Sequence, residues 1–276
     1  MSDEPAQLRY KLTVAYRGTA YHGWQRQMVP GEDTSAAELP TVQNVLRLAL
    51  QRTVGHPVNV VGASRTDAGV HAKGQAASFE TIRHQIAPER LMAATNAKLP
   101  ADVAIRSIEP VANDFDVLSD TAEKAYRYTV HNGLKKDVFA GDVMLHLPPM
   151  PSPLDVAAMH EAAARFVGEH DFASFAKPGH GRESTVRTVT SAKVSRDGDR
   201  VHFEIAGTGF LWHQVRIMTG TLLRVGAGKV PPEAMTTILS ARDREAAGPT
   251  APPHGMCLLW VRHRRQVGSA TVAAAE

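Results

Sequence analysis

The stretch GASRTDAGVHAKGQ, residues 62–75, gathers side chains that can do chemistry. Arg65 and Asp67 stand two positions apart in a segment whose glycines predict a turning loop. An ordinary aspartate titrates at about 3.9, so at neutral pH it is an ionised acceptor and can act as a nucleophile. A nearby arginine would keep it charged and oriented. Two interpretations stay open: Asp67 caps a turn before Gly69, or it is a carboxylate held ready for catalysis.

Two further stretches carry polar groups at suggestive positions. KAYRYTVHN places Tyr126 and Tyr128 on one face of a predicted strand, where they either pack in a half-buried sheet or offer a ring on which a base stacks. Arg216 follows LWHQV near the start of a predicted helix. It is either an ordinary surface cation or, with the N–H groups of the helix start, a binding group for an anion.

Motifs for cofactors and metals are incomplete. The start of a nucleophile elbow at 62–64 fails because Thr66 replaces the last glycine. Leu223 and Val230 break a P-loop, and a dinucleotide fingerprint lacks its third glycine. The histidines show no metal-ligand spacing, and a single cysteine cannot support a zinc site. The sequence therefore predicts neither a metal nor an organic cofactor.

Composition sets broad limits. The 276 residues suffice for one large or two ordinary domains, and a 43% apolar share supports a real core. A net charge of +3 permits nucleic-acid binding without requiring it. The polar start and the absence of a long apolar run predict neither a secretory signal nor a membrane span. With one cysteine, the expected location is the cytoplasm.

Hydrophobic periodicity predicts the elements of the first half. Alternation predicts strands, helical spacing predicts helices, and Thr41 is the expected N-cap of the first helix. In chain order, the expected elements are a strand at 10–16, a helix at 41–55, strands at 57–63 and 74–80, a helix from Pro88, and a strand at 102–109. This is the β-α-β-β-α-β order of ferredoxin-like domains.

The second half repeats that order. The expected elements are a strand at 124–132, a helix at 152–170, two strands at 188–207 joined at Asp197-Gly198, a helix at 211–229, a short helix at 232–240 and a strand at 257–263. The repeat predicts an α+β protein of two ferredoxin-like lobes, at 8–113 and 114–265. An alanine-rich tail at 266–276 is expected to be disordered.

From about residue 8 to 264 the chain resembles the tRNA pseudouridine synthase A family. The resemblance lies in seven blocks in family order: YHGWQRQ, SRTDAGVHAKGQ, NAKLP, KAYRYTVHN, GEHDFASF, FLWHQVRIMTGTLLRVG and TAPPHGMCLLWV. It implies a pseudouridine synthase fold with a central cleft between two lobes. It also implies a homodimer that acts without metal or cofactor on tRNA, at uridine 38, 39 or 40 of the anticodon stem-loop.

The resemblance assigns roles to four residues. Asp67 matches the catalytic aspartate of the family, and Arg65 matches the arginine before it. Tyr126 matches the tyrosine that contacts the target base. Arg216 matches an arginine that lies close to the aspartate in the family.

The implied chemistry uses these residue types. The uridine must leave its stack, detach, rotate and reattach through C5. Tyr126 would hold the flipped base while Arg65 fills the vacated space. Asp67 either adds to C1′ or assists loss of the neighbouring proton, and the sequence leaves both routes open. A charged carboxylate in a dry pocket needs a cationic partner, which Arg216 is expected to supply.

Three departures from the family pattern stand out. Ser64 replaces a usual glycine, the segment DFDVLSD at 114–120 lacks the expected arginine and second phenylalanine, and the loop at 28–40 is long. Two alternative functions also stay open, namely a noncatalytic RNA-binding protein and an enzyme acting on a small molecule.

Overall fold

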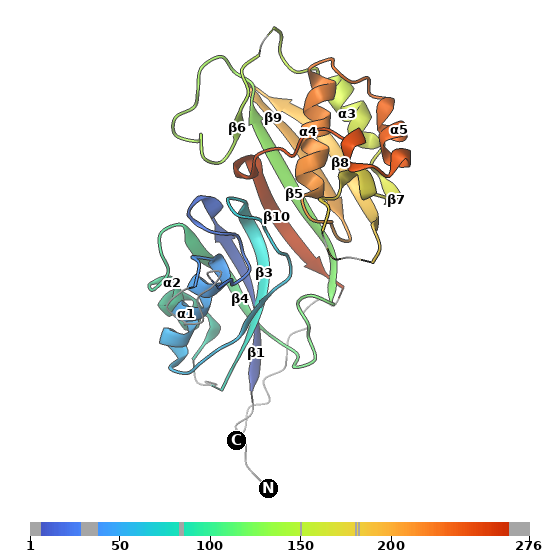
Figure 1. Cartoon of the computed structure of the whole chain (residues 1–276). Coiled ribbons are helices and arrows are strands. Elements are labelled where there is room, and N and C mark those ends of the chain that lie inside the picture. The colour runs from blue at the N-terminus through green and yellow to red at the C-terminus, as the bar shows by residue number, and fades with distance from the viewer. Residues whose placement is uncertain are drawn as a thin grey trace. The chain divides into compact units, whose positions relative to one another are not determined.

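The computed structural model describes residues 7–28, 38–82, 86–149, 151–179, 181 and 183–264. It separates into two compact units, shown in Figure 1. The first unit comprises Met1–Ala122 and Trp260–Glu276, and the second comprises Glu123–Leu259. The predicted tail at 266–276 lies outside the described residues, and the lobe limits of 8–113 and 114–265 stay a prediction.

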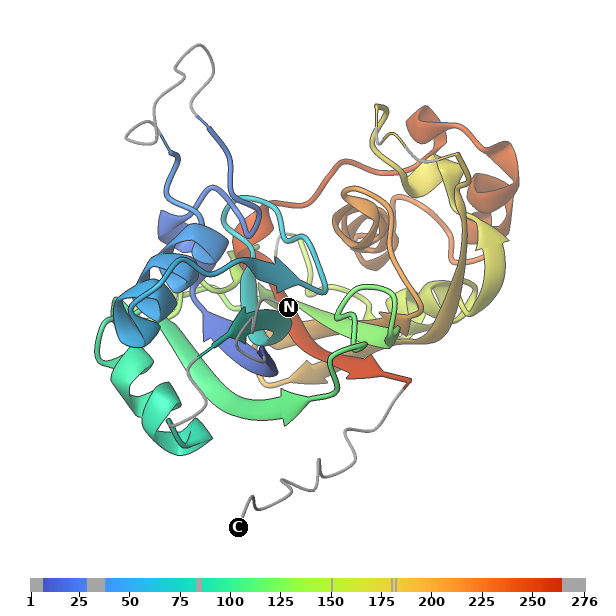
Figure 2. The same ribbon diagram turned by 90° about the horizontal axis from the view of Figure 1, so that it is seen from below.

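The first unit contains every element predicted for its half. Its elements are β1 (Leu8–Tyr16), the short 3-10 helix η1 (Gly18–Ala20), α1 (Val42–Val54), β2 (Val60–Gly62), β3 (His71–Thr81), α2 (Pro88–Asn96) and β4 (Val103–Val111). The strands pair antiparallel in the order β4-β1-β3-β2. Helices α1 and α2 pack against each other and lie side by side in Figure 2.

Burial explains why these segments fold as they do. Alternate residues of β1 are buried: Tyr10, Leu12, Val14 and Tyr16. This spacing of two is what a strand with one covered face requires. Helix α1 buries Val42, Leu46, Ala49, Leu50 and Val54 at helical spacing, and ends at Gly55 in the left-handed conformation.

The cap prediction for α1 is wrong in one respect. Thr41 occupies the N-cap position with extended backbone, but its side chain makes no capping hydrogen bond. The hydroxyl is buried and has no hydrogen-bond partner. The N-terminus of α1 is instead linked to the preceding segment, because the N–H of Val42 donates to the carbonyl of Gly23 at 3.2 Å.

The second unit repeats the pattern with additions. Its elements are β5 (Thr121–His131, beginning at the unit boundary), β6 (Leu145–His146), α3 (Val156–Ala164), β7 (Gly168–Asp171), η3 (Ala173–Phe175), β8 (Val186–Asp197), β9 (Arg200–Gly207), α4 (Gln214–Gly226), α5 (Ala234–Ala241), η4 (Arg244–Ala246), η5 (Pro253–Gly255) and β10 (Met256–His263), which ends in the first unit. The strand order is β10-β5-β9-β8-β7, with β6 beside β5.

The two units therefore share one topology. Without the added β6, β7 and α5, the second unit runs β5, α3, β8, β9, α4, β10, again β-α-β-β-α-β. In both units the fourth strand lies beside the first, the first beside the third, and the third beside the second. This confirms the predicted α+β class with two ferredoxin-like repeats.

The helix predicted at 152–170 is too long. Helix α3 ends at Ala164, after Asp155 has capped its start by accepting from the N–H of Ala158. Phe166 then turns into the core, 5.2 Å from the ring of Phe175. The chain passes through Gly168 at φ +116° and pairs as β7 with β8. Tertiary packing thus overrides the helical spacing of this segment.

Candidate active site

Asp67 lies in a tight turn on the first unit. The N–H of Val70 donates to the Asp67 carbonyl at 3.1 Å, and Gly69 adopts φ +79°. The flanking Thr66 is buried, Asp67 is partly exposed and Arg65 is exposed. The predicted turn is therefore present, and within it the buried Thr66 stands between the exposed Arg65 and the partly exposed Asp67.

A buried glutamine fixes the start of this loop. Gln75 on β3 is fully buried, its amide donates to the carbonyl of Ser64 at 2.6 Å, and its oxygen accepts from the Ser64 N–H at 3.2 Å. Ser64 does not have a positive φ angle. The backbone here therefore does not require the glycine that the family usually carries.

The segment at 18–24 forms a cradle around the rest of the loop. The N–H of Trp24 donates to the Thr66 carbonyl at 3.1 Å, and the N–H of Gly69 donates to the Tyr21 carbonyl at 3.3 Å. Gly23 has φ +88°, and a Cβ added there would lie 2.5 Å from the Thr66 carbonyl oxygen. Only glycine meets both conditions without movement of the loop.

The end of the loop is held equally closely. A Cβ on Gly18 would lie 2.0 Å from the Val70 carbonyl oxygen, and the Gly18 N–H donates to His71 Nδ1 at 3.0 Å. The Tyr16 hydroxyl and Thr66 Oγ1 are 2.8 Å apart. These supporting contacts were not predicted from the sequence, although the YHGWQRQ block contains part of the cradle.

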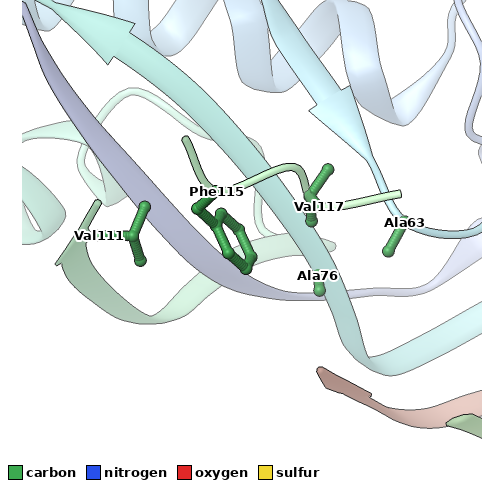
Figure 3. Close-up of a cluster of buried hydrophobic side chains, with 5 residues drawn as sticks. All are labelled: Ala63, Ala76, Val111, Phe115 and Val117. Carbon is green, nitrogen blue, oxygen red and sulfur yellow. The ribbon is translucent and has the colours of Figure 1, made fainter. Parts of the chain in front are cut away.

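The segment at 114–120, which departs from the family pattern, contributes two residues to the core of the first unit. Phe115 and Val117 are buried with Ala63, Ala76 and Val111 in one hydrophobic cluster, which Figure 3 shows. Ala63 directly precedes Ser64, so the cluster supports the start of the Asp67 loop. Phe115 and Val117 are therefore core residues of the first unit.

The polar residues of that segment close a turn. Asp116 accepts from the N–H groups of Leu118 and Ser119, each at 2.8 Å, and its own N–H donates to Asp120 at 2.9 Å. The bond from Ser119 is the main reason why the pKa of Asp116 is lowered. Leu118 remains exposed.

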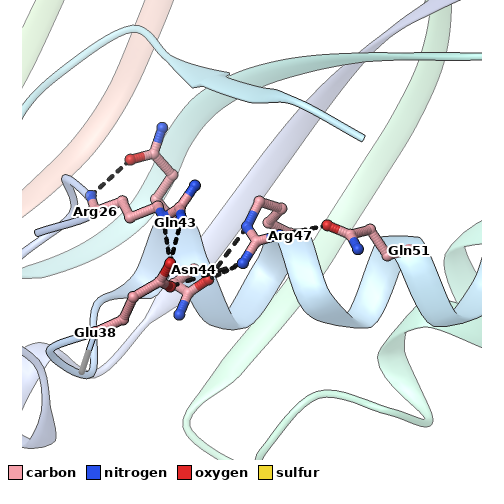
Figure 4. A network of polar contacts seen from close by, with 6 residues as sticks. All are labelled: Arg26, Glu38, Gln43, Asn44, Arg47 and Gln51. Carbon is pink, nitrogen blue, oxygen red and sulfur yellow. Dashed lines mark hydrogen bonds and ion pairs between the residues drawn. The ribbon is translucent and has the colours of Figure 1, made fainter. Parts of the chain in front are cut away.

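A polar network joins the two ends of the long loop at 28–40. Glu38, almost fully covered, pairs with Arg26 and lies 3.7 Å from Arg47 on α1. Gln43 accepts from the Arg26 N–H at 2.7 Å (Figure 4). Residues 29–37 of this loop lie outside the described residues.

The tyrosines of β5 are buried in the second unit. Tyr126 packs edge-on against Phe210, with ring centroids 5.5 Å apart. The Tyr128 hydroxyl donates to the Pro252 carbonyl at 2.8 Å. Burial raises the pKa of Tyr128, and the charge of Arg216 opposes that rise, so Tyr128 stays neutral at physiological pH.

Arg216 is a braced cation rather than a purely solvent-facing one. It is the third residue of α4 and partly buried. Its Nε donates to the Ala251 carbonyl at 2.8 Å, and the Ala251 N–H donates to the Arg216 carbonyl at 3.0 Å. A Cβ on Gly220 would lie 1.7 Å from the Pro249 carbonyl oxygen, so the 249–251 segment lies tightly on α4.

The predicted site residues thus form two pairs. Arg65 and Asp67 share the loop of the first unit, whereas Tyr126 and Arg216 belong to the second unit. Within the second unit, Arg216 bonds to Ala251, and the next residue, Pro252, bonds to Tyr128.

Among the described residues, no group of three or more His, Cys, Asp or Glu side chains is arranged to hold a metal ion. None of the helices in the same ranges is long and apolar enough to cross a membrane.

The fold and the loop define a duplicated α+β protein whose candidate reactive group is a carboxylate. Comparison with known proteins gives the family. The family model described as tRNA pseudouridine synthase matches residues 12–118 and 162–263. The chain belongs to this family, and it is an isomerase that converts uridine in tRNA to pseudouridine.

Curated relatives agree over nearly the whole chain. A protein of Moorella thermoacetica named tRNA pseudouridine synthase A is 46% identical, with 92% of this chain and 98% of the relative covered. A protein of Geotalea uraniireducens with the same name is 40% identical, with 91% and 98% covered. One of Clostridium perfringens, named tRNA pseudouridine synthase A 2, is 37% identical, with 90% and 96% covered.

Proposed function

We propose that this protein isomerises uridine at position 38, 39 or 40 of the anticodon stem-loop of tRNA, with Asp67 as the catalytic carboxylate. The observation that carries the proposal is the intact SRTDAG loop, held by buried backbone contacts, in a chain that belongs to the tRNA pseudouridine synthase family. A turn cap alone would not need the Gly18, Gly23 and Gln75 contacts around it.

Asp67 acts at the ribose of the target uridine. The N1–C1′ bond breaks, the base rotates, and a C5–C1′ bond forms. The C5 hydrogen leaves as a proton and N1 gains one, so the product is an isomer of the substrate. Asp67 either adds to C1′ or takes part in removing the neighbouring proton, and both routes use an ionised carboxylate.

Tyr126 and Arg65 handle the base. Tyr126 contacts the flipped uracil, and its position against Phe210 supports this role because the ring is held in one orientation. Arg65 fills the space that the uridine leaves in the stack, and its exposure supports this role.

Arg216 supplies the cation that the carboxylate needs in a dry pocket. Its contact with Ala251 supports this role, because a guanidinium held at Nε keeps its two terminal nitrogens in a fixed orientation. We further propose that the protein works as a homodimer in the cytoplasm, without metal or organic cofactor, as the family resemblance implies.

Tritium release tests this function. Transcripts of tRNA labelled with tritium at C5 of uridine lose the label when pseudouridine forms, whereas binding alone leaves it in place. The native protein should release tritium, and the release should disappear when uridines 38, 39 and 40 are all replaced by cytidine. Release that persists from such a transcript would contradict the proposed positions.

The matched variants are Asp67→Asn and Asp137→Asn. Both remove one carboxylate charge, but Asp137 is on the second unit, where it makes a 3.5 Å ion pair with Arg200. Asp67→Asn should bind tRNA and release no tritium, and Asp137→Asn should release it at the native rate. A fully active Asp67→Asn would refute the catalytic role.

A further inference from the structure

Trp212 exposes a large aromatic ring just before α4 of the second unit, and the proposed chemistry does not use it. The side chain is 44% exposed. The ammonium group of Lys177, also an exposed residue, lies 4.1 Å from the centre of the Trp212 ring. An exposed aromatic ring beside a cation is the pairing with which proteins bind single-stranded nucleic acid.

The backbone holds this pair in place. The Lys177 N–H donates to the Trp212 carbonyl at 3.1 Å, so the two segments are joined through their backbones at these two residues. The His213 ring centre lies 5.0 Å from that of Trp212. The ring therefore rests on a fixed support, whereas the Lys177 ammonium sits on a flexible four-carbon stem.

The same segment carries a contact to Tyr126. Phe210, two residues before Trp212, packs edge-on against Tyr126. Residues 210–212 thus lead from the tyrosine proposed to hold the target base to the exposed ring. A nucleotide that follows or precedes the flipped uridine would find Trp212 as the next aromatic surface along this segment.

We propose that Trp212 stacks a second base of the tRNA substrate, beside the uridine held at Tyr126, and that Lys177 then moves from the ring to a phosphate of the same strand. The proposal rests on the proposed function, because it takes tRNA as the substrate. Stacking of a base on an aromatic ring outweighs an exposed cation–π contact, so the base displaces the ammonium. Lys177 occupies the ring only until RNA arrives.

The first test measures the affinity of the full-length protein for tRNA by filter binding. Trp212→Ala and Trp212→Leu should each raise Kd roughly tenfold to a hundredfold, because both remove the aromatic face. Trp212→Phe should stay within about threefold of the native Kd, since it keeps a ring. The rate of tritium release at saturating tRNA should change little in these variants, so the weaker binding should appear as a higher KM.

The second test measures how Kd depends on salt. Lys177→Gln should reduce the slope of log K against log salt by about 0.7, the value for one phosphate contact on a single strand. Arg262→Gln is the matched control, because the Arg262 guanidinium lies 4.0 Å from the centre of the Trp260 ring on β10. It removes the same kind of contact and should leave the slope nearly unchanged.

In the first test, the proposal would be overturned if Trp212→Ala bound tRNA with native affinity, or if Trp212→Leu bound as tightly as Trp212→Phe. In the second test, it would be overturned if Lys177→Gln and Arg262→Gln gave equal slopes of log K against log salt. Failure of the proposed function has a different signature, namely a native protein that releases no tritium from tRNA.

Discussion

The Asp67 loop of the first unit and the Tyr126–Arg216 region of the second unit are built in different ways. The loop is positioned through backbone groups, glycines and one buried glutamine. In the second unit the side chains proposed to take part in the reaction are themselves part of the packing: Tyr126 is buried, and Arg216 donates to the Ala251 carbonyl.

Because of this difference, we expect substitutions in the two regions to affect reaction rate and folding stability differently. Changing Asp67 should abolish reaction while leaving the free energy of unfolding nearly unaltered. Changing the tyrosines or Arg216 should affect binding and folding together, because the same contacts serve both. Changes to the residues that hold the Asp67 loop in shape should lower both the reaction rate and the free energy of unfolding.

The largest combined effect is expected from Gly23→Ala. The added Cβ would meet the Thr66 carbonyl oxygen at 2.5 Å, and the residue has φ +88°, so the loop must move. We expect a loss of about 3 kcal/mol in unfolding free energy and of at least about 100-fold in tritium release. Urea denaturation and the release assay measure these losses. The control Gly209→Ala, where nothing lies within 4 Å of the added Cβ, should be close to native.

The next effect concerns the glutamine of the loop. Gln75→Met leaves the buried N–H and carbonyl of Ser64 without their side-chain partner, which should cost about 2 kcal/mol in urea denaturation. Gln43→Met is the control, since Gln43 also bonds to backbone groups of the first unit but is only partly buried. If the two variants lost the same stability, burial would not be what makes the Gln75 contact important.

A smaller effect is expected in the second unit. Tyr128→Phe removes the hydrogen bond to the Pro252 carbonyl and should lower the free energy of unfolding by about 1 kcal/mol. A modest rise in KM is also expected, because Ala251, which precedes Pro252, accepts the hydrogen bond from Arg216. Tyr10→Phe in the first unit keeps its stacked contact with Phe79 and should cost less. A Tyr128→Phe protein of native stability would show that the hydroxyl bond does not anchor the 251–252 segment.

The smallest effect is a dependence of stability on pH. Burial lowers the pKa of His202 and His254 in the second unit and of His263 in the first. Between the lowered pKa and the ordinary value of about 6.5 the unfolded chain binds more protons, so stability falls as pH falls below about 6.5. Urea denaturation at several pH values should show this, and His202→Gln should flatten the slope. If the dependence of the unfolding free energy on pH were unchanged in His202→Gln, His202 would not be a source of that dependence.

Local patterns predicted much of the fold. Alternation predicted β1 and β5, and Asp197-Gly198 predicted the β8–β9 hairpin, where Gly198 adopts φ +55°. The prediction for β3 was three residues short at its start, because this strand is buried on both faces and lacks alternation. The short β6 and β7 were missed, since their pairing partners are distant in sequence and nothing local signals them.

The same limit applies to the site. Turn chemistry and the family blocks indicated Asp67 and its glycines. The cradle was not predicted, because its contacts join residues 18–24 to a loop more than 40 positions later through backbone atoms. At Gly18 and Gly23 there is no room for a Cβ, but the sequence shows this only as a glycine. Other glycines, such as Gly209, have open space around them, so the residue type alone does not reveal a close contact.

The central claim is that Asp67 performs the chemistry while contributing little to binding or folding. The most direct measurement compares the native protein and Asp67→Asn in a single-turnover experiment, with tritium release, tRNA affinity and urea denaturation recorded on the same preparations. We predict native affinity, native unfolding free energy and a release rate reduced by at least about 10⁴-fold. Release at the native rate, or a loss explained entirely by weaker binding or unfolding, would contradict the claim.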